Sequence, residues 1–450
     1  MIKIQDLDIL NPLRFENCNL EAEITGAHFD SRKCGNGFLY IALKGQQHDG
    51  HDFIASAIKN GSVVAIVNAD YDNQAGYPVI FTDNVELFFA RAAQLWRQKS
   101  SAKVVAITGT NGKTSTKEML HRLLSLKFKT LVTEGNYNNQ LGVPLTLFRI
   151  QADTEIAVIE MGTNRFGEIV FLSEITAPDY GLITNIGEGH LEELIDKAGV
   201  LREKIALFEY LKSHNGLFYI NSEDSLLSGY DYSGARVKSF GLTAQADFRL
   251  DSHGTDADGK GCFSVADQQV VLGSLGITGC KNAAAALAVG SDLGIDLNEM
   301  CQALQNFGAA SKRGEILQTA TTRLIIDCYN ANPSSMQCAV NSTLANGAER
   351  TMLVLGDMLE MGSAAKRVHS ELGRLLKSSA CGRILLFGSE MAACAEVLNQ
   401  DVRVTYFNTD FPALQNCFDA EFRNFRQVLL KGSRGMRLER LLENLKGETE

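Results

Sequence analysis

Short apolar runs alternate along the chain with stretches of helical spacing. Apolar and β-branched residues fill Phe38–Ala42, Val63–Val67 and Val104–Ile107, and the last run is typical of a buried parallel strand. Residues Lys117–Leu126 instead place leucines at helical spacing. The pattern predicts an α/β protein in which helices cover the strands.

The middle of the chain shows the most regular alternation. Ile156–Met161, Gly181–Ile186 and Gly216–Ile220 have the composition of strands and are separated by helical patterns, which predicts a parallel sheet. The pattern from Ser222–Val271 is more typical of short antiparallel strands and loops. An alanine-rich helix, Ala283–Leu293, then follows.

The last part of the chain repeats the strand and helix alternation. Strands are expected at Leu324–Ile326, Met352–Leu355, Ile384–Phe387 and Val428–Leu430. Polar motifs come directly after three of these strands, where doubly wound sheets bind ligands. The layout is Rossmann-like but lacks the GxGxxG fingerprint.

The length and the linkers predict three domains. A chain of 450 residues exceeds what one core usually organises. A polar stretch, Arg97–Ser101, precedes the Val104 strand, and the last α/β unit begins near Ser311. We predict a small N-terminal α/β domain at 1–98, a central parallel-sheet domain at 99–310 and a C-terminal Rossmann-like domain at 311–450.

The composition indicates the cellular compartment in which the protein is expected. The formal charge of −10 and the pI near 5.4 argue against a general affinity for nucleic acid or anionic membrane. The start MIKIQDLDIL does not look like a signal peptide, and no run approaches the roughly 20 apolar residues of a membrane span. The cysteines lack CxxC or zinc spacing, which indicates reduced thiols. We expect a cytoplasmic protein without membrane insertion, and a monomer by default.

The most specific motif is TGTNGKTS, which lies between the Val104 strand and a helix. Its glycines let backbone N–H groups approach phosphate. Its lysine can reach the β- and γ-phosphates, and the hydroxyl of the threonine after that lysine can reach magnesium. The match to a Walker A motif is imperfect because Ile107 stands where glycine is usual. We expect ATP and Mg²⁺ to bind here, through Gly109, Thr110, Asn111, Gly112, Lys113, Thr114 and Ser115.

Four more polar residues follow in three segments of the central domain. Asn138 and Asn139 lie in GNYNNQLGVPLT, Glu160 ends an apolar strand, and His190 lies in NIGEGHLE. The carboxylate of Glu160 should project into the crevice at the carboxyl edge of the sheet. Taken alone, the asparagines are also turn residues and the histidine could be structural.

With the phosphate loop, these segments resemble the Mur ligase superfamily, which includes folylpolyglutamate synthetase. The resemblance runs through nearly the whole chain. It implies that Asn138 and Asn139 face the substrate, that Glu160 is a magnesium ligand, and that His190 helps to hold a second metal ion.

The resemblance also implies a lysine carbamylated by CO₂, which supplies an anionic oxygen to magnesium. Lys204 in VLREK matches it. However, Glu193–Asp196 replaces a GFGS-like turn and Ile205 with Ala206 replaces Gly-Glu, so the alignment could slip to Lys197. An ordinary surface lysine is the remaining alternative.

Further contacts are implied on both sides of the central domain. Asn282 matches the last position of a GxHN motif that contacts adenine, although Lys281 replaces the histidine and a helix N-cap is the competing role. Arg313 resembles the arginine that reaches the ATP phosphates. Ser31, in the N-terminal Asp-Ser-Arg, resembles a contact to the UDP end of a substrate.

Motifs near the C-terminus resemble the family branch that adds D-alanyl-D-alanine. DCYNANP and GDMLEMG carry this resemblance, together with KGSRGM at the end of the chain. It implies that Asn330 seats the nucleotide and Asp327 orients it. Lys431 and Arg434 are expected to anchor the dipeptide or the phosphates.

The implied function is ATP-dependent ligation of D-alanyl-D-alanine to UDP-N-acetylmuramoyl-tripeptide through an acyl phosphate, in peptidoglycan precursor synthesis. Another Mur ligase or a folylpolyglutamate synthetase is the alternative within the same class. A nucleotide-binding relative without catalytic activity is the alternative from a different class.

Overall fold

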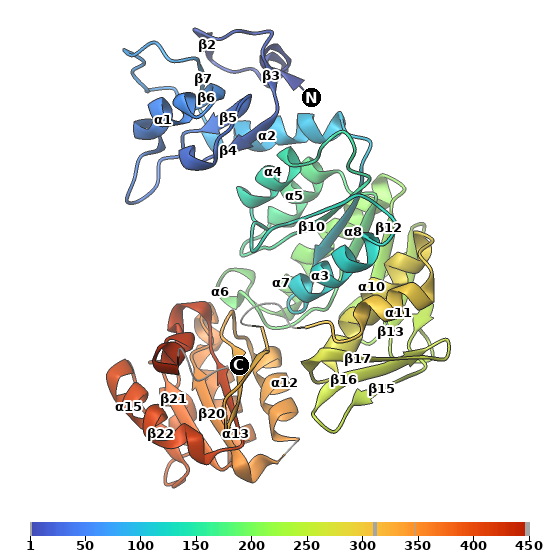
Figure 1. The fold of residues 1–450 in the computed structure, drawn as a ribbon, viewed down its shortest axis with the longest axis vertical. Helices are drawn as coiled ribbons and strands as arrows, with labels where there is room; N and C mark the ends of the chain where they lie inside the picture. The colour runs from blue at the N-terminus through green and yellow to red at the C-terminus, as the bar shows by residue number, and fades with distance from the viewer. Residues whose placement is uncertain (1, 309–312, 346, 446–450) are drawn as a thin grey trace.

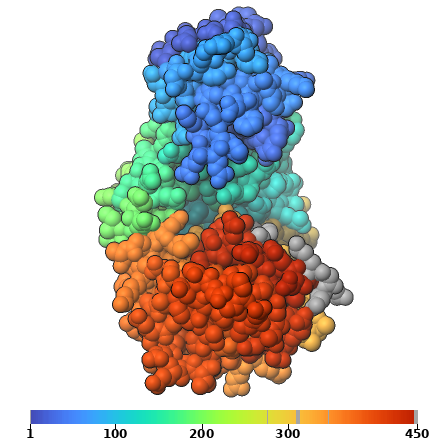
Figure 2. Space-filling view, turned by 90° about the vertical axis from the view of Figure 1, so that its left-hand side faces the viewer, coloured from blue at the N-terminus to red at the C-terminus, as the bar shows by residue number. Residues whose placement is uncertain are grey.

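Three α/β lobes follow one another along the long axis of the molecule (Figure 1). The computed structural model describes residues 2–308, 313–345 and 347–445. In the space-filling view the N-terminal lobe rests on the central lobe, and the C-terminal lobe lies at the opposite end (Figure 2). The expected three-domain α/β architecture is confirmed. Within the described ranges no helix is long and apolar enough to cross a bilayer.

The N-terminal lobe contains a five-stranded sheet in the order β2-β7-β6-β5-β4. Strand β2 is antiparallel to β7, and the other neighbours are parallel. A separate pair, β1 and β3, is antiparallel. The elements are β1 (Ile2–Lys3), β2 (Arg14–Glu16), β3 (Glu23–Ile24), β4 (Gly26–His28), β5 (Phe38–Ile41), α1 (Ile54–Lys59), β6 (Ser62–Asn68), β7 (Val79–Thr82) and α2 (Val85–Gln98).

The central lobe is built on a seven-stranded parallel sheet in the order β14-β13-β12-β11-β8-β10-β9. Its strands are β8 (Lys103–Thr108), β9 (Thr130–Val132), β10 (Ile156–Glu160), β11 (Tyr180–Ile183), β12 (Leu217–Asn221), β13 (Arg236–Gly241) and β14 (Phe248–Arg249). Its helices are α3 (Lys113–Leu124), α4 (Gly142–Phe148), α5 (Glu168–Thr176), α6 (Leu191–Leu194), α7 (Lys197–Lys204), α8 (Ala206–Ser213), α9 (Ser225–Ser228), α10 (Thr278–Asp292) and α11 (Leu297–Leu304).

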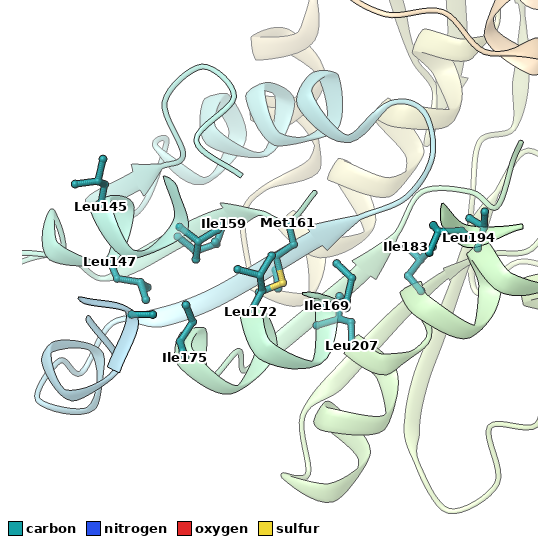
Figure 3. Close-up of a cluster of buried hydrophobic side chains, with 14 of the residues drawn as sticks. Leu145, Leu147, Ile159, Met161, Ile169, Leu172, Ile175, Ile183, Leu194 and Leu207 are labelled. Carbon is teal, nitrogen blue, oxygen red and sulfur yellow. The ribbon is translucent and has the colours of Figure 1, made fainter. Parts of the chain in front are cut away.

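Both faces of this sheet are buried, as the apolar runs predict. Along β8, Val104 and Ala106 join one hydrophobic cluster, and Val105 and Ile107 join another on the opposite face. Figure 3 shows part of the first cluster, where Ile159 of β10 lies among side chains from α4 and α5. Helices α3 and α10 supply the second cluster. The sheet is therefore a rigid support for the loops at its carboxyl edge.

The prediction for residues 222–271 is partly wrong. Strands β13 and β14 lie in this segment but extend the large sheet in parallel. Only β15 (Ser252–Thr255), β16 (Lys260–Val265) and β17 (Gln268–Leu275) form the expected antiparallel sheet. Strand β14 is only two residues long and β13 carries exposed charged residues, so neither has the apolar run of a buried parallel strand.

The C-terminal lobe contains a six-stranded sheet in the order β18-β19-β23-β20-β21-β22. Strand β18 is antiparallel to β19, and the other neighbours are parallel. The elements are β18 (Glu315–Gln318), β19 (Arg323–Asp327), α12 (Pro333–Leu344), β20 (Thr351–Gly356), α13 (Ala365–Lys377), β21 (Arg383–Phe387), α14 (Ala392–Val397), β22 (Val404–Tyr406), α15 (Phe411–Glu421) and β23 (Gln427–Lys431).

Helix α2 joins the N-terminal lobe to the central sheet by packing on α4 and α5. Arg97, expected in a polar linker, is instead buried in its last turn. Its guanidinium donates to the carbonyls of Thr176 (3.0 Å) and Ala177 (3.1 Å) and lies 3.4 Å from Asp179 Oδ2. This side chain supplies donors at the C-terminal end of α5, where the last carbonyls of a helix lack partners within it.

Replacing Arg97 by methionine should lower the free energy of unfolding by about 2–3 kcal/mol, because buried carbonyls lose their donors. Trp96, the chain's single tryptophan, is buried beside this joint and donates to Ile150 O at 3.1 Å. Its fluorescence in a urea titration therefore reports the joint directly. Arg91→Met, which removes a half-exposed pair with Glu174, should cost less than about 1 kcal/mol. Equal losses in the two variants would contradict the role given to Arg97.

Candidate active site

The loop between β8 and α3 needs glycine at two positions. Gly109 has a φ of 144° and Gly112 a φ of 83°. A Cβ at Gly109 would lie 1.9 Å from Thr184 Oγ1, and one at Gly112 would lie 2.5 Å from Asn282 Oδ1. Side chains are therefore excluded on both conformational and steric grounds. The loop leads into the N-terminus of α3, an arrangement that suits a bound phosphate.

The segment after β11 holds this loop in place. Thr184 Oγ1 and Asn185 Nδ2 both donate to the carbonyl of Asn111, at 2.6 and 2.9 Å. In return, the backbone N–H of Asn111 donates to Asn185 Oδ1 at 3.1 Å, and that of Gly187 donates to Thr110 Oγ1 at 2.9 Å. The loop is fixed before any ligand arrives.

Lys113 folds back over the same loop. Its Nζ donates to the carbonyls of Gly109 (2.7 Å) and Thr110 (3.2 Å). Burial lowers the pKa of Lys113 to about 8, and the neighbouring charge of Arg313 acts in the same direction, whereas Glu160 opposes it. An anionic ligand in the loop would give this cation a stronger partner than two carbonyls.

Glu160 is buried at the end of β10, and its carboxylate has partners on both oxygens. Thr114 Oγ1 donates to Oε2 at 2.9 Å, and Asn138 Nδ2 donates to Oε1 at 2.8 Å. The ammonium of Lys117, also buried, lies 3.8 Å from Oε2 and donates to Thr133 O at 2.7 Å. The predicted pairing of Thr114 with Glu160 is thus present, whereas the contacts of Asn138 and Lys117 with this carboxylate were not predicted.

This donor set fits a magnesium ion that arrives with a nucleotide. Magnesium prefers oxygen ligands and is usually held by one or two carboxylates together with substrate phosphates. A hydroxyl and a carboxylate, from Thr114 and Glu160, already meet beside the phosphate loop. In the part of the chain that the structure describes, no three or more His, Cys, Asp or Glu residues gather into a permanent metal centre.

His190 and Lys204 lie in the segment that follows. His190 faces the cleft with a φ of 55°, and its Nδ1 is 2.6 Å from Glu360 Oε2. Lys204 is buried at the end of α7. Burial lowers the pKa of Lys204 well below its usual range, and the charge of Lys113 lowers it further. Lys197, at the start of the same helix, lines the cleft directly.

Asn282 and Arg313 approach the phosphate loop from other elements. Asn282 is buried within α10, whose N-cap is Ile277, so the alternative role of helix N-cap is wrong. The Lys281 ammonium beside it pairs with Glu223 Oε2 at 2.9 Å. Arg313 stacks over the Tyr329 ring, with Cζ 3.6 Å from the ring centre.

The C-terminal sheet contributes its own carboxyl edge. Lys431, at the end of β23, is buried and donates to Asp327 Oδ2 at 2.5 Å and to Asn330 O at 3.2 Å. Arg434 differs from expectation: 57% of its side chain is exposed, it pairs with Glu439 Oε1 at 2.8 Å, and it does not line the cleft. It follows the last strand by a turn that points it outward.

A cleft of about 930 Å³ gathers these residues between the central and C-terminal lobes. The predicted site residues that line it are Thr110, Asn111, Gly112, Lys113, Ser115, Asn138, Asn139, Glu160, His190, Asn282, Arg313, Asp327, Asn330 and Lys431. Gly109, Thr114 and Lys204 lie behind its wall. Ser31 is buried in the N-terminal lobe, outside this cleft, where its carbonyl accepts from Asn60 Nδ2 at 2.9 Å.

Sequence reasoning missed a direct link between the two walls of the cleft. Asn332 Nδ2 donates to Asn111 Oδ1 at 2.7 Å, and Asn111 Nδ2 donates to Ser334 Oγ at 2.8 Å. Asn332 also caps α12 through Ser335. Its place in DCYNANP was the available signal, since that motif follows a strand at the ligand-binding edge.

Profiles of three domains match the chain. The Mur ligase family catalytic domain matches residues 23–107, the Mur ligase middle domain matches 107–290, and the Mur ligase glutamate ligase domain matches 312–434.

Curated relatives and solved structures agree with these domain matches. UDP-N-acetylmuramoyl-tripeptide–D-alanyl-D-alanine ligase of Bacillus subtilis is 32% identical over 94% of this chain and 93% of its own length. The Escherichia coli enzyme of that name is 35% identical over 86% and 85%. A crystal structure of MurF from Acinetobacter baumannii superposes with a TM-score of 0.83 at 30% identity, covering 93% and 92%. MurF ligase from Thermotoga maritima, in complex with ADP, gives 0.82 at 26% identity, covering 94% and 97%.

Replacing Gly109 by alanine should weaken binding of a fluorescent ATP analogue by at least about ten-fold, because the new Cβ displaces the loop from Thr184. Gly234→Ala is the matched control: Gly234 also has a positive φ (75°), but a Cβ there meets nothing within 4 Å. It should bind the analogue as the unaltered chain does. Equal affinity in both variants would show that the loop conformation does not matter for binding.

Proposed function

The chain belongs to the Mur ligase family, and we propose that it joins D-alanyl-D-alanine to UDP-N-acetylmuramoyl-tripeptide, using ATP, in peptidoglycan precursor synthesis. The products would be UDP-N-acetylmuramoyl-pentapeptide, ADP and phosphate. The observation that carries the proposal is the cleft in which the phosphate loop faces Asp327, Asn330 and Lys431. Curated relatives with this activity in their names, among them those from Bacillus subtilis and Escherichia coli, match the chain over most of its length.

The reaction has to activate a carboxylate, which is a poor electrophile in water. The terminal carboxylate of the tripeptide attacks the γ-phosphorus of ATP, giving an acyl phosphate and ADP. The amine of the dipeptide then attacks the acyl carbon, and phosphate leaves as the amide forms. Both steps depend on orienting reactants and stabilising charge on the phosphoryl group.

The phosphate loop would bind ATP for the first step, the transfer of its γ-phosphate. Backbone N–H groups at the start of α3 would bind the phosphates, and Lys113 would exchange its loop carbonyls for phosphate oxygens. Thr114 and Glu160 would hold Mg²⁺, which when bound neutralises charge on the transferring group. Lys117 places a cation 3.8 Å from the Glu160 carboxylate at the end of its strand.

We assign the carbamate to Lys204 and place a second Mg²⁺ near it and His190. Only a neutral amine adds to CO₂, and the burial that lowers the Lys204 pKa favours that form. Lys197 lines the cleft more directly, but it begins its helix in a less buried position.

The remaining assignments follow the positions of the residues around the cleft. Ser115 would extend the phosphate cradle, Asn282 and Asn330 would seat the nucleotide, and Arg313 would reach its phosphates. Asp327, held by Lys431, would orient the nucleotide, while Asn138 and Asn139 would face the acceptor. Ser31 would contact the UDP end in the N-terminal lobe. Arg434 would need to leave Glu439 before it could contact the dipeptide.

We also propose that the protein acts in the cytoplasm as a monomer, with domain boundaries near residues 98 and 310. The acidic charge of the chain and the nucleotide-linked acceptor support the proposed cytoplasmic location. The first boundary, near residue 98, is supported by the end of α2 at Gln98 and the start of β8 of the central sheet at Lys103.

Phosphate release from Mg-ATP should require both the UDP-tripeptide and D-alanyl-D-alanine, with the UDP-pentapeptide detected by mass. Lys113→Ala should lower the rate about 100- to 1,000-fold, since it removes a cation from the developing charge. Release with a different Mur acceptor or with a folate would indicate another ligase of the family. No release with any of these acceptors would favour a binding protein without catalysis.

Lys204→Ala should lower the rate about 100-fold or more, and formate or acetate should restore part of it by supplying the missing carboxylate oxygen. Lys197→Ala is the control and should retain the rate within a few-fold. A nearly full rate for Lys204→Ala, with a loss for Lys197→Ala, would move the carbamate to Lys197.

A further inference from the structure

An acidic side chain from the C-terminal lobe meets the cleft histidine of the central lobe. Glu360 belongs to the GDMLEMG segment after β20, and its Oε2 lies 2.6 Å from His190 Nδ1. The contact is short but bent, so that Nδ1 lacks a well-aligned hydrogen bond among the described residues. The contact nevertheless brings together two segments that are remote in sequence.

Backbone structure on both sides prepares this meeting. His190 has a φ of 55° and Glu360 a φ of 62°, a left-handed conformation that residues other than glycine rarely adopt. The N–H of Glu192 donates to the carbonyl of Glu360 at 3.2 Å. A Cβ on Gly362 would lie 2.9 Å from Glu192 Cα. Such local strain persists where surrounding structure enforces it, and it clusters at functional sites.

A second ion pair at the same junction has no contact with the histidine ring. Arg367, in α13, lies 3.2 Å from Glu188 Oε1 and also pairs with Glu371. It therefore joins the same two lobes but has no direct route to His190. Comparing the two pairs therefore distinguishes an effect of joining the lobes from an effect on the histidine ring.

The position of the carboxylate on the ring has a chemical consequence. A neutral imidazole carries its proton on one nitrogen and offers the lone pair of the other to a ligand. A carboxylate at Nδ1 favours the proton there and leaves Nε2 free, as second carboxylates do for many metal-binding histidines. Glu360 can thus set both the tautomer and the direction of the ring.

We propose that Glu360 is a positioning residue, which holds His190 so that Nε2 faces the magnesium-binding part of the cleft. This inference rests on the proposed function, in which His190 helps to hold a metal ion. Since Glu360 comes from the C-terminal lobe, the histidine is correctly oriented only when that lobe is docked. Docking would therefore strengthen metal binding as well as bring the two sets of substrate contacts together.

The test measures Mn²⁺ binding by electron paramagnetic resonance, in the presence of a non-hydrolysable ATP analogue, so that no turnover is needed. Glu360→Ala should weaken Mn²⁺ binding about ten-fold or more. Arg367→Ala should stay within about two-fold, because an exposed ion pair contributes little. Binding of the analogue alone should be unchanged in both variants.

A double-mutant cycle decides whether Glu360 acts through His190. If it does, His190→Ala combined with Glu360→Ala should bind Mn²⁺ no more weakly than His190→Ala alone. Additive losses, a loss in Arg367→Ala equal to that in Glu360→Ala, or unchanged binding in His190→Ala would each overturn the proposal. Glu360→Gln keeps the side-chain volume and provides the same cycle should the alanine variant unfold. Failure of the ligase proposal would appear separately, in the phosphate-release assay.

Discussion

The site depends on one packing constraint: the loop of residues 109–112 lies directly against the segment that follows β11. Thr184 Oγ1 lies where a Cβ of residue 109 would be, and two side chains donate to the carbonyl of Asn111. The loop can therefore hold Lys113 and the start of α3 toward a phosphate without first becoming ordered. A preorganised loop contributes more to catalysis than one that must be ordered during the reaction.

The C-terminal lobe completes what this loop begins. Asn332 and Ser334 contact Asn111, and Glu360 contacts His190, so both the phosphate loop and the histidine segment have partners across the cleft. None of these contacts is made within one lobe. A ligase that builds an unstable acyl phosphate benefits from such an arrangement, because the lobes can exclude water once both substrates are bound.

The sequence predicts those parts of the molecule that local patterns determine. Strands β8, β10, β11 and β12 of the large sheet, the phosphate loop and the projection of Glu160 follow from apolar runs and from residues next to them. Contacts between remote segments, such as Glu360 with His190 and Lys117 with Glu160, leave no periodic signal. The parallel strands β13 and β14 were misread because their sequences lack the apolar run of a buried strand. The exposed position of Arg434 was not predicted, because its 3-10 helix after β23 and its pairing with Glu439 leave no sequence signal.

The central claim is that this cleft activates a carboxylate by phosphorylation, and isotope transfer tests it most directly. UDP-N-acetylmuramoyl-tripeptide labelled with ¹⁸O in its terminal carboxylate would be converted with Mg-ATP and D-alanyl-D-alanine, and the released phosphate analysed by mass. An acyl phosphate requires one of the labelled oxygens to leave with the phosphate. Label in AMP, or phosphate free of label while the amide forms, would contradict the account.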